Sequence, residues 1–288
     1  MKKIRIKSPA KINLTLDVLG TEGGYHQLKS LVASVDLYDA ITLWKKESGT
    51  GISINIKGIP VSCPITENNA YITAKKYLEE HGLDGVNISI EKNIPVGGGM
   101  GGSSADIAGV LRGLNELFEK DYDLYEMASC LGSDSAYMLD GGFAIMEGRG
   151  NEVTKLDVPV TLYILLITES KGISSRGAYK KYDELAKTYP ECTDKACERL
   201  MAGDIDGFCA LIKNDLYPSA VATVSEIGDN VIALKDAGAV TALMTGSGSV
   251  TYGIFKTAKD RDVAYAKLYP TYGDKLVKAK TLTREEIK

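Results

Sequence analysis

Alternating apolar and polar side chains predict strands at many places along the chain. The run from residue 11 to 19 is the clearest, because Ile12, Leu14, Leu16 and Val18 are apolar and the positions between them are polar, which is the period of a half-buried strand. Shorter runs with the composition of strands lie at 31–37, 40–44, 52–57, 85–92, 141–148, 161–168, 240–244, 249–255 and 275–282. The first part of the chain is therefore predicted to be rich in β-structure.

Apolar positions three and four residues apart predict helices between these strands. The clearest stripe follows residue 102, so one face of that helix is expected to be buried. Its apolar positions are Ile107, Val110, Leu111, Leu114, Leu117 and Phe118. Ser103 or Ser104 is the expected N-cap, because a serine oxygen can accept a hydrogen bond from the first turn. Further helices are predicted at 69–80, 122–131, 176–187, 193–201, 205–213, 219–237 and between the last two strands.

The order of these elements favours an α+β fold. Strands and helices are mixed without the regular alternation of a doubly wound α/β sheet. A chain of 288 residues is long enough for two domains, each with its own core. Because helices dominate after about residue 160, we predict an N-terminal domain at 1–158 and a C-terminal domain at 159–288.

Composition excludes several classes of function. A net charge of −4 and a pI near 5.4 lack the basic surplus with which a protein neutralises nucleic-acid phosphates. No segment has the pattern of a signal peptide or a membrane span, so we expect a cytoplasmic protein without a membrane partner. The sequence makes no prediction about the oligomeric state. The five cysteines are scattered, as in reduced proteins, at positions 63, 130, 192, 197 and 209.

Histidine is also scarce. His26 and His81 are the only two, which excludes a polyhistidine metal centre and leaves almost nothing for a histidine-based triad. The partner expected on these grounds is a small molecule.

A glycine-rich segment, PVGGGMGGSSAD at 95–106, carries the strongest chemical signal. Glycines adopt positive φ and let an anion approach the backbone, and the N-terminus of the following helix adds free N–H donors. We therefore predict a phosphate-binding loop, in which serine hydroxyls contact phosphate oxygens or Mg²⁺, with Ser104 as the candidate metal ligand. Residues 95–104 are called the glycine loop below. Its predicted phosphate contacts are Pro95, Gly97, Gly98, Gly99, Gly101, Gly102, Ser103 and Ser104.

Three other interpretations of this loop are weaker. Gly97, Gly99 and Gly102 match G-x-G-x-x-G, but that dinucleotide fingerprint normally follows the first strand of a βαβ unit. A P-loop would end in Gly-Lys-Ser/Thr, which is missing. A glycine-rich turn without a ligand would lose much conformational entropy on folding with no interaction to compensate for it.

Three motifs in the same order resemble those of the GHMP kinases, which include galactokinase, homoserine kinase and mevalonate kinase. They are SPAKINLTLDVLG at 8–20, the glycine loop, and MTGSGSVTYGIF at 244–255. The resemblance covers nearly the whole chain. It implies an N-terminal ATP-binding domain with a left-handed βαβ unit, a C-terminal ferredoxin-like domain, and an active site between them that uses ATP and Mg²⁺.

The resemblance also implies roles for individual residues. Lys11 and Asp134 match the pair that flanks the acceptor hydroxyl, where the carboxylate accepts the proton and the ammonium stabilises charge. From the residues alone, the pattern favours a helix N-cap or surface carboxylate for Asp134 and a solvated strand lysine for Lys11. Asn69 and Lys92 match positions on the adenine side.

A Gly-Tyr-His turn resembles the branch of the family that phosphorylates the 2-hydroxyl of a cytidyl-diphospho-methylerythritol. There, His26 would hydrogen-bond to the cytosine, and Tyr25 and Tyr179 would stack on it. Asn13 would contact the acceptor, as would Gly246 and Ser247 of the third motif. A kinase of another alcohol, such as homoserine or a sugar, and a catalytically silent nucleotide-binding relative are the alternatives.

Some positions depart from the family pattern. Ser135, Ala136 and Tyr137 follow the expected catalytic aspartate where Val-Pro-Phe is usual, and Ser103 replaces a glycine. The turn before Tyr25 is one residue short. Because Ala136 stands where the family has this proline, we expect the orientation of the Asp134 side chain to be affected.

Overall fold

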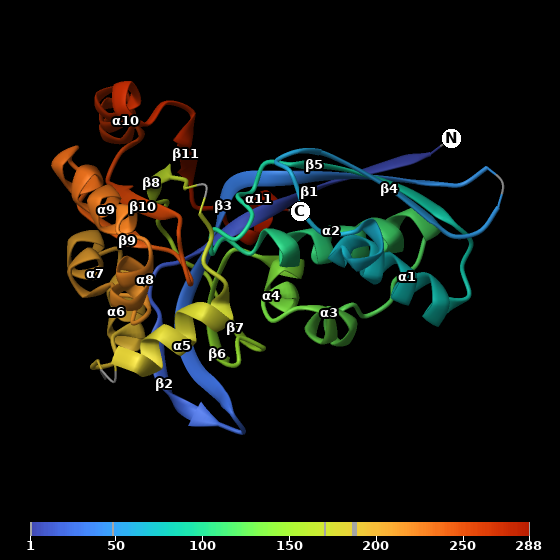
Figure 1. Ribbon diagram of the computed structural model, residues 1–288, viewed down its shortest axis with the longest axis horizontal. Coiled ribbons are helices and arrows are strands. Elements are labelled where there is room, and N and C mark those ends of the chain that lie inside the picture. Colours follow the sequence, from blue (N-terminus) through green and yellow to red (C-terminus); the bar gives the residue numbers. More distant parts are fainter. Residues whose placement is uncertain (1, 48, 170, 186–188, 288) are drawn as a thin grey trace.

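The computed structural model describes residues 2–47, 49–169, 171–185 and 189–287. In these residues the strands form two sheets, the first from the earlier part of the chain and the second from the later part (Figure 1). The seven-stranded sheet consists of β1 (Lys3–Asn13), β2 (Asp17–Glu22), β3 (Tyr25–Lys45), β4 (Ile52–Gly58), β5 (Val86–Lys92), β6 (Phe143–Gly148) and β7 (Glu152–Leu156). The four-stranded sheet consists of β8 (Tyr163–Ile167), β9 (Thr241–Met244), β10 (Thr251–Phe255) and β11 (Leu276–Lys280).

The long strand β3 organises the first sheet. Its 21 residues pair antiparallel with β1 and β2 on one side and with β5 and β6 on the other. The two strands expected at 31–37 and 40–44 are therefore a single strand, and that prediction was wrong. The prediction of one strand at 11–19 was also wrong: β1 ends at Asn13 and β2 begins at Asp17, because the chain turns where Leu14 and Thr15 both donate to the Leu31 carbonyl.

The expected βαβ unit is formed by β4, α1 (Asn69–His81) and β5, with the two strands parallel. The Asn68 side chain caps α1 by accepting from the Ala70 amide, and the helix ends at Gly82 in a left-handed conformation. The helix predicted at 69–80 is thus confirmed, with local signals at both ends.

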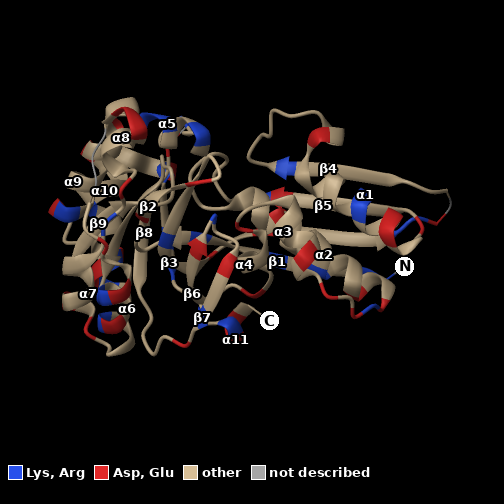
Figure 2. Ribbon diagram, turned by 90° about the horizontal axis from the view of Figure 1, so that it is seen from below, with Lys and Arg blue, Asp and Glu red and all other residues tan. Residues whose placement is uncertain are grey.

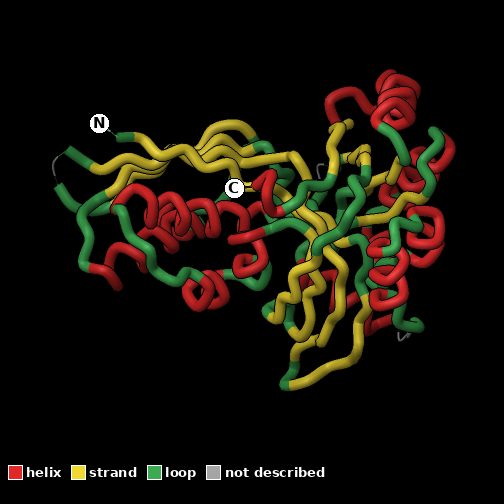
Figure 3. Tube along the Cα trace, turned by 180° about the vertical axis from the view of Figure 1, so that it is seen from behind, coloured by secondary structure: helices red, strands yellow, loops and turns green. Residues whose placement is uncertain are grey.

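Four helices lie along one face of the seven-stranded sheet (Figures 1 and 3). They are α1, α2 (Gly102–Phe118), α3 (Tyr125–Leu131) and α4 (Ser135–Asp140). The apolar stripe of α2 is buried as predicted, apart from Phe118, which is partly buried against the core. The short helix α4 and strand β7 were not predicted.

The second sheet has the strand order β11-β8-β10-β9, with every neighbouring pair antiparallel. With helices between β8 and β9 and between β10 and β11, the chain follows the β-α-β-β-α-β order of the ferredoxin-like fold. The helices are α5 (Ser175–Leu185), α6 (Thr193–Met201), α7 (Ile205–Leu211), α8 (Tyr217–Thr223), α9 (Glu226–Asp236), α10 (Ala258–Tyr272) and the terminal α11 (Arg284–Ile287). Single 3₁₀ turns lie at Ile65–Glu67 and Gly273–Lys275.

One long helix expected at 219–237 is two helices. Val224 ends α8 in an extended conformation, with φ of −135° and ψ of 96°, and α9 starts two residues later. The apolar period continues through this break, so the spacing alone could not reveal it. The predicted helix at 176–187 corresponds to α5, and its last two positions lie outside the described residues.

The two sheets are joined near the C-terminal end of the chain. Thr281 bridges to Val35 of β3, the Leu282 amide donates to the Ser34 carbonyl at 2.9 Å, and the Lys280 amide donates to Asp36 at 2.6 Å. The largest hydrophobic core also contains residues from both sheets. The domain boundary between 158 and 159 stays a prediction.

Charge is spread along both parts of the molecule. Figure 2 shows basic and acidic residues interspersed along the ribbon rather than gathered by sign. Over the described residues, none of the helices is both long enough and apolar enough to cross a bilayer.

Candidate active site

A cavity of about 540 Å³ lies where the glycine loop, the end of β1, the start of α4 and the turn after β9 meet. All of the predicted site residues except Tyr25 and His26 line it. The predicted residues in its wall are Lys11, Asn13, Asn69, Lys92, Pro95, Gly97, Gly98, Gly99, Gly101, Gly102, Ser103, Ser104, Asp134, Tyr179, Gly246 and Ser247. Segments from both sheets therefore build one site.

The glycine loop leaves the start of α2 open to an anion. Gly101, with φ of +70°, is the N-cap, and the first helical bond joins the Ala105 amide to the Gly101 carbonyl at 2.8 Å. The expected serine cap was wrong, because Ser103 and Ser104 lie inside the first turn. Since no described side chain caps this helix, the N–H groups of its first turn remain available to a phosphate.

The glycine loop packs directly against the turn formed by residues 244–248, called the Gly246 turn below. Gly99 has a φ of +77°, and a Cβ built on it would lie 2.2 Å from the Thr245 carbonyl oxygen. A Cβ on Gly246 would likewise lie 2.8 Å from the Gly99 carbonyl oxygen. Only glycine permits this approach, so the second and third sequence motifs interlock.

We expect Gly99→Ala to displace the glycine loop, lowering the free energy of unfolding by about 1–3 kcal/mol for the clash and about 1–2 kcal/mol for the left-handed backbone. The KM for the phosphate donor should rise as well. Gly82→Ala is the matched control, because Gly82 has a φ of +59° and nothing within 4 Å of a built Cβ. Urea denaturation and steady-state kinetics measure both effects, and equal behaviour of the two variants would contradict the packing argument.

Lys11 and Asp134 form an ion pair inside the cavity. Their Nζ and Oδ2 atoms are 3.2 Å apart, and the side chains are 7% and 26% exposed. Asp134 occupies the N-cap position of α4, yet its carboxylate accepts no capping bond from the described residues. The carboxylate therefore faces Lys11 and the cavity instead of capping the helix.

Asn13 connects this pair to the rest of the site. Its Oδ1 accepts from Lys11 Nζ at 2.6 Å, and its Nδ2 donates to Ser30 Oγ at 2.7 Å. Its backbone amide donates to Thr245 Oγ1 at 2.9 Å, and Thr245 Oγ1 donates in turn to the Gly99 carbonyl at 3.3 Å. Ser30 and Thr245 were missed in the sequence, where a hydroxyl within a strand or before a glycine turn has no distinctive pattern.

Lys92 is buried between two carboxylates. Its Nζ lies 2.5 Å from Asp39 Oδ2 and 2.7 Å from Asp106 Oδ2, and all three side chains are at most 7% exposed. Burial raises the pKa of Asp106 to about 7, against the opposing effect of the Lys92 charge. Asp106 Oδ1 has no hydrogen-bond partner among the described residues. Lys92 thus lines the cavity while its charge is largely engaged by this cluster.

Asn69 lines the cavity and contacts the glycine loop. Its Nδ2 donates to Ser103 Oγ, which connects the start of α1 to the first turn of α2. Glu67, Asn68 and Cys63 also line the cavity.

Two of the three residues predicted to bind the cytosine, His26 and Tyr179, lie against each other. Their rings stack with centroids 4.6 Å apart and planes at 20°, and His26 Nε2 is 2.8 Å from Asp183 Oδ1. Tyr25 is 55% exposed and packs under the guanidinium of Arg149, 3.7 Å from the ring centroid. Burial, followed by the nearby Asp134 charge, raises the pKa of Tyr179 to about 12. Arg149 lines the cavity and was not predicted.

The glycine loop fits a phosphate group, because the N-terminus of α2 has no side-chain cap from the described residues and its first residues, Gly102 and Ser103, line the cavity. Across the described ranges, no three acidic, histidine or cysteine side chains group as a metal site. Mg²⁺ commonly binds through substrate phosphates and few protein ligands, so this arrangement suits an ion that arrives with its nucleotide, with Ser104 at hand in the cavity wall.

Two family models match the chain. One describes the N-terminal domain of GHMP kinases and matches residues 68–148, and the other describes the C-terminal domain of GHMP kinases and matches residues 195–275. The matches include the glycine loop and Asp134 in the first part and the Gly246 turn in the second.

Individual relatives are similar over nearly the full length. The chain is 36% identical to a 4-diphosphocytidyl-2-C-methyl-D-erythritol kinase from Syntrophomonas wolfei, over 94% of this chain and 96% of that protein. It is 33% identical to the kinase of the same name from Clostridium tetani, over 94% and 98%.

Solved structures show the same similarity. A crystal structure of 4-(cytidine 5'-diphospho)-2C-methyl-D-erythritol kinase superposes with a TM-score of 0.83 at 28% identity, covering 96% of this chain and 99% of that chain. A homoserine kinase from Cytophaga hutchinsonii gives a TM-score of 0.74 at 19% identity, covering 98% and 96%, which shows a shared fold.

Proposed function

The chain belongs to the GHMP kinase family, and on that premise we propose that it phosphorylates the 2-hydroxyl of 4-diphosphocytidyl-2-C-methyl-D-erythritol, using ATP and Mg²⁺, in the non-mevalonate route to isoprenoids. The observation that carries the proposal is the Lys11–Asp134 pair, 3.2 Å apart in the same cavity as the glycine loop. The names and identities of the relatives support the choice of acceptor.

The proposed reaction is an in-line transfer. The acceptor oxygen forms a bond to the γ-phosphorus, the bond from that phosphorus to the β–γ bridging oxygen breaks, and ADP leaves. Asp134 accepts the hydroxyl proton, and Lys11 offsets negative charge at the acceptor oxygen. Asn13 fixes the Lys11 ammonium by accepting one of its hydrogen bonds. The first turn of α2 binds the donor phosphates, and Mg²⁺ neutralises part of their charge when bound.

The acceptor is assigned to the end of the cavity that Tyr179 lines. Tyr179 offers a stacking face for a pyrimidine, and His26 offers a ring nitrogen beside it. Arg149 supplies a cation in the wall between Tyr25 and the cavity. All five cysteines are free thiols, which fits the cytoplasmic location that we propose for the enzyme.

An acceptor panel tests this function. Purified protein is incubated with Mg-ATP and the cytidyl substrate, homoserine or a sugar, and ADP release is followed with Asp134→Asn as the control. We expect turnover of the cytidyl substrate alone. Turnover of homoserine without the cytidyl substrate would refute the acceptor assignment, and ATP binding without any turnover would favour a silent relative.

Tyr179→Ala is expected to raise the KM for the cytidyl substrate by about tenfold, because base–aromatic stacking contributes about 1–3 kcal/mol. The KM for ATP should be unchanged, since the glycine loop does not contain this residue. Tyr179→Phe keeps the ring and serves as the control, with a KM near that of the wild type. A parallel rise in both KM values would indicate a general loss of structure instead.

A further inference from the structure

Asn214 is buried beside the active-site cavity and makes three side-chain hydrogen bonds. It is 4% exposed and lies between α7 and α8. Its Nδ2 donates to the Met244 carbonyl at 3.0 Å and to the Gly246 carbonyl at 2.8 Å, and its Oδ1 accepts from the Leu216 amide at 2.9 Å. Both protons of the Asn214 side-chain amide are therefore donated to carbonyls of the Gly246 turn.

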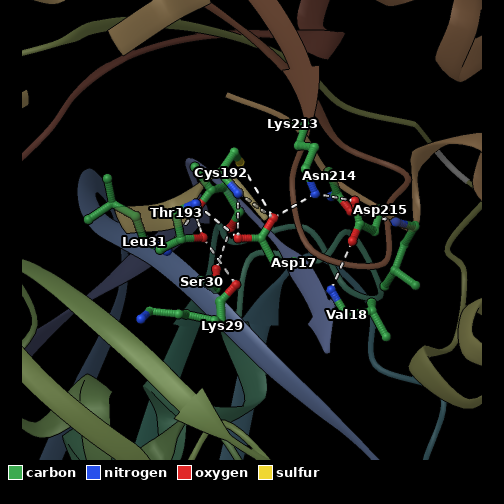
Figure 4. Close-up of polar contacts among 12 residues, drawn as sticks. Asp17, Val18, Lys29, Ser30, Leu31, Cys192, Thr193, Lys213, Asn214 and Asp215 are labelled. Carbon is green, nitrogen blue, oxygen red and sulfur yellow. Dashed lines mark hydrogen bonds and ion pairs between the residues drawn. The ribbon is translucent and has the colours of Figure 1, made fainter. Parts of the chain in front are cut away.

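The segment that carries Asn214 is itself firmly held. Lys213 Nζ lies 2.6 Å from Asp17 Oδ1 and 2.5 Å from Asp215 Oδ1, as Figure 4 shows. The backbone of Leu16 donates to the Lys213 carbonyl and accepts from the Asp215 amide, both at 2.9 Å. Residues on either side of Asn214 are thus fixed to the start of β2.

Asp17 anchors this arrangement in the first sheet. Burial alone would raise its pKa, but hydrogen bonds from Lys213, Thr193 and the Cys192 backbone outweigh burial and lower it. The amides of Cys192 and Thr193 donate to Asp17 Oδ2 at 3.0 and 2.9 Å (Figure 4). Asp17 therefore remains an anion that binds two segments distant in the sequence, residues 192–193 and Lys213.

From Asn214 a continuous series of contacts leads to the catalytic pair. Asn214 fixes the carbonyls on both sides of Thr245, and Thr245 Oγ1 accepts from the Asn13 amide and donates to the Gly99 carbonyl. Asn13 Oδ1 then accepts from Lys11 Nζ at 2.6 Å. Displacement of the Gly246 turn would consequently misplace both the lysine and the glycine loop.

We infer that Asn214 is a positioning residue for phosphoryl transfer, which sets the Gly246 turn against Asn13 and the glycine loop without touching substrate itself. The inference rests on the proposed function for its kinetic consequence. Its structural consequence is independent of the acceptor: loss of the two amide donors should loosen the turn whatever the enzyme phosphorylates.

The test compares Asn214→Ala with Asn230→Ala. Asn230 is also a buried asparagine, 2% exposed, whose Nδ2 donates to Glu169 Oε1, and neither residue lines the active-site cavity. We expect Asn214→Ala to lower kcat by about tenfold to a hundredfold, as misplaced reactive groups do, with little change in the KM for ATP. Asn230→Ala should be destabilised comparably and keep its kcat.

Hydrogen exchange gives the second measurement. The Thr245 amide donates to Val250 and the Gly248 amide to Thr245, both at 3.0 Å, so faster exchange of these two amides in Asn214→Ala reports a loosened turn. Asn214→Asp, which keeps the acceptor for Leu216 but removes both donors, replaces the alanine variant if that variant fails to fold. Unchanged exchange with wild-type kcat would overturn the inference. If exchange is faster in the variant but the wild-type protein phosphorylates no acceptor, only the proposed function is refuted.

Discussion

Asp134→Asn is expected to reduce kcat by about 10²–10⁴-fold, the range that a positioned general base contributes. The amide keeps the shape of the side chain but cannot accept the hydroxyl proton, and it no longer pairs electrostatically with Lys11. KM for both substrates should change little, because the cavity wall is preserved. Stopped-time assays of ADP release with the cytidyl substrate provide the measurement.

Asp140→Asn is the matched control for this variant. Asp140 lies on the same helix, α4, but pairs with Lys155 and Tyr125 and does not line the active-site cavity. Its replacement should leave kcat close to that of the wild type. A fall in kcat of the same size in both variants would assign the effect to α4 as a whole and remove Asp134 from its role.

Lys92→Met is expected to give the largest loss of stability, about 3–5 kcal/mol, because removal of one member of a buried ion cluster leaves charge uncompensated. Asp39 is fully buried and Asp106 nearly so, and both would lose their shared ammonium. Urea denaturation followed by the fluorescence of the single tryptophan, Trp44, measures the change. Lys155→Met, which breaks an exposed pair, should cost less than about 1 kcal/mol.

The loss in Lys92→Met should depend on pH. The pKa of Asp106 is raised to about 7 in the fold, so stability from its protonated form is present at acidic pH and is lost as the pH rises through 7. The Lys92 charge opposes this rise in the pKa of Asp106, so ionisation of Asp106 costs more free energy in the variant. The variant is therefore expected to lose more stability at pH 8 than at pH 5, and a pH-independent loss would contradict the assigned cluster.

Local patterns were sufficient to predict much of the fold. The stripe in α2, the helix α1 and the buried strand β8 follow from spacing and composition within each segment, whereas the parallel unit around α1 was implied by the family resemblance. The errors lie where tertiary contacts override the local pattern. Residues 11–19 keep their alternation through the turn between β1 and β2, because Leu14 and Leu16 within the turn are both buried.

The site residues that belong to short sequence motifs could be predicted, whereas those that act through contacts between distant segments could not. The glycine loop and the Lys11 and Asp134 motifs are each visible as short segments, and the structure brings them into one cavity. Thr245, Ser30 and Asn214 act through contacts between segments far apart in the sequence, which no single motif records. The stack of His26 on Tyr179 likewise depends on where the β2–β3 hairpin meets α5.

The join between β3 and residues 280–282 has a consequence for the order in which the protein matures. Ser34, Val35 and Asp36 are synthesised well before the residues that pair with them, since Asp36 and Lys280 are 244 positions apart in the sequence. A ribosome-bound chain can assemble the strands of the first sheet, but the second sheet can dock through these contacts only after residues 280–282 have been made. Contacts of such long sequence separation slow folding. Catalytic competence should therefore appear only after residues 280–282 have left the ribosome.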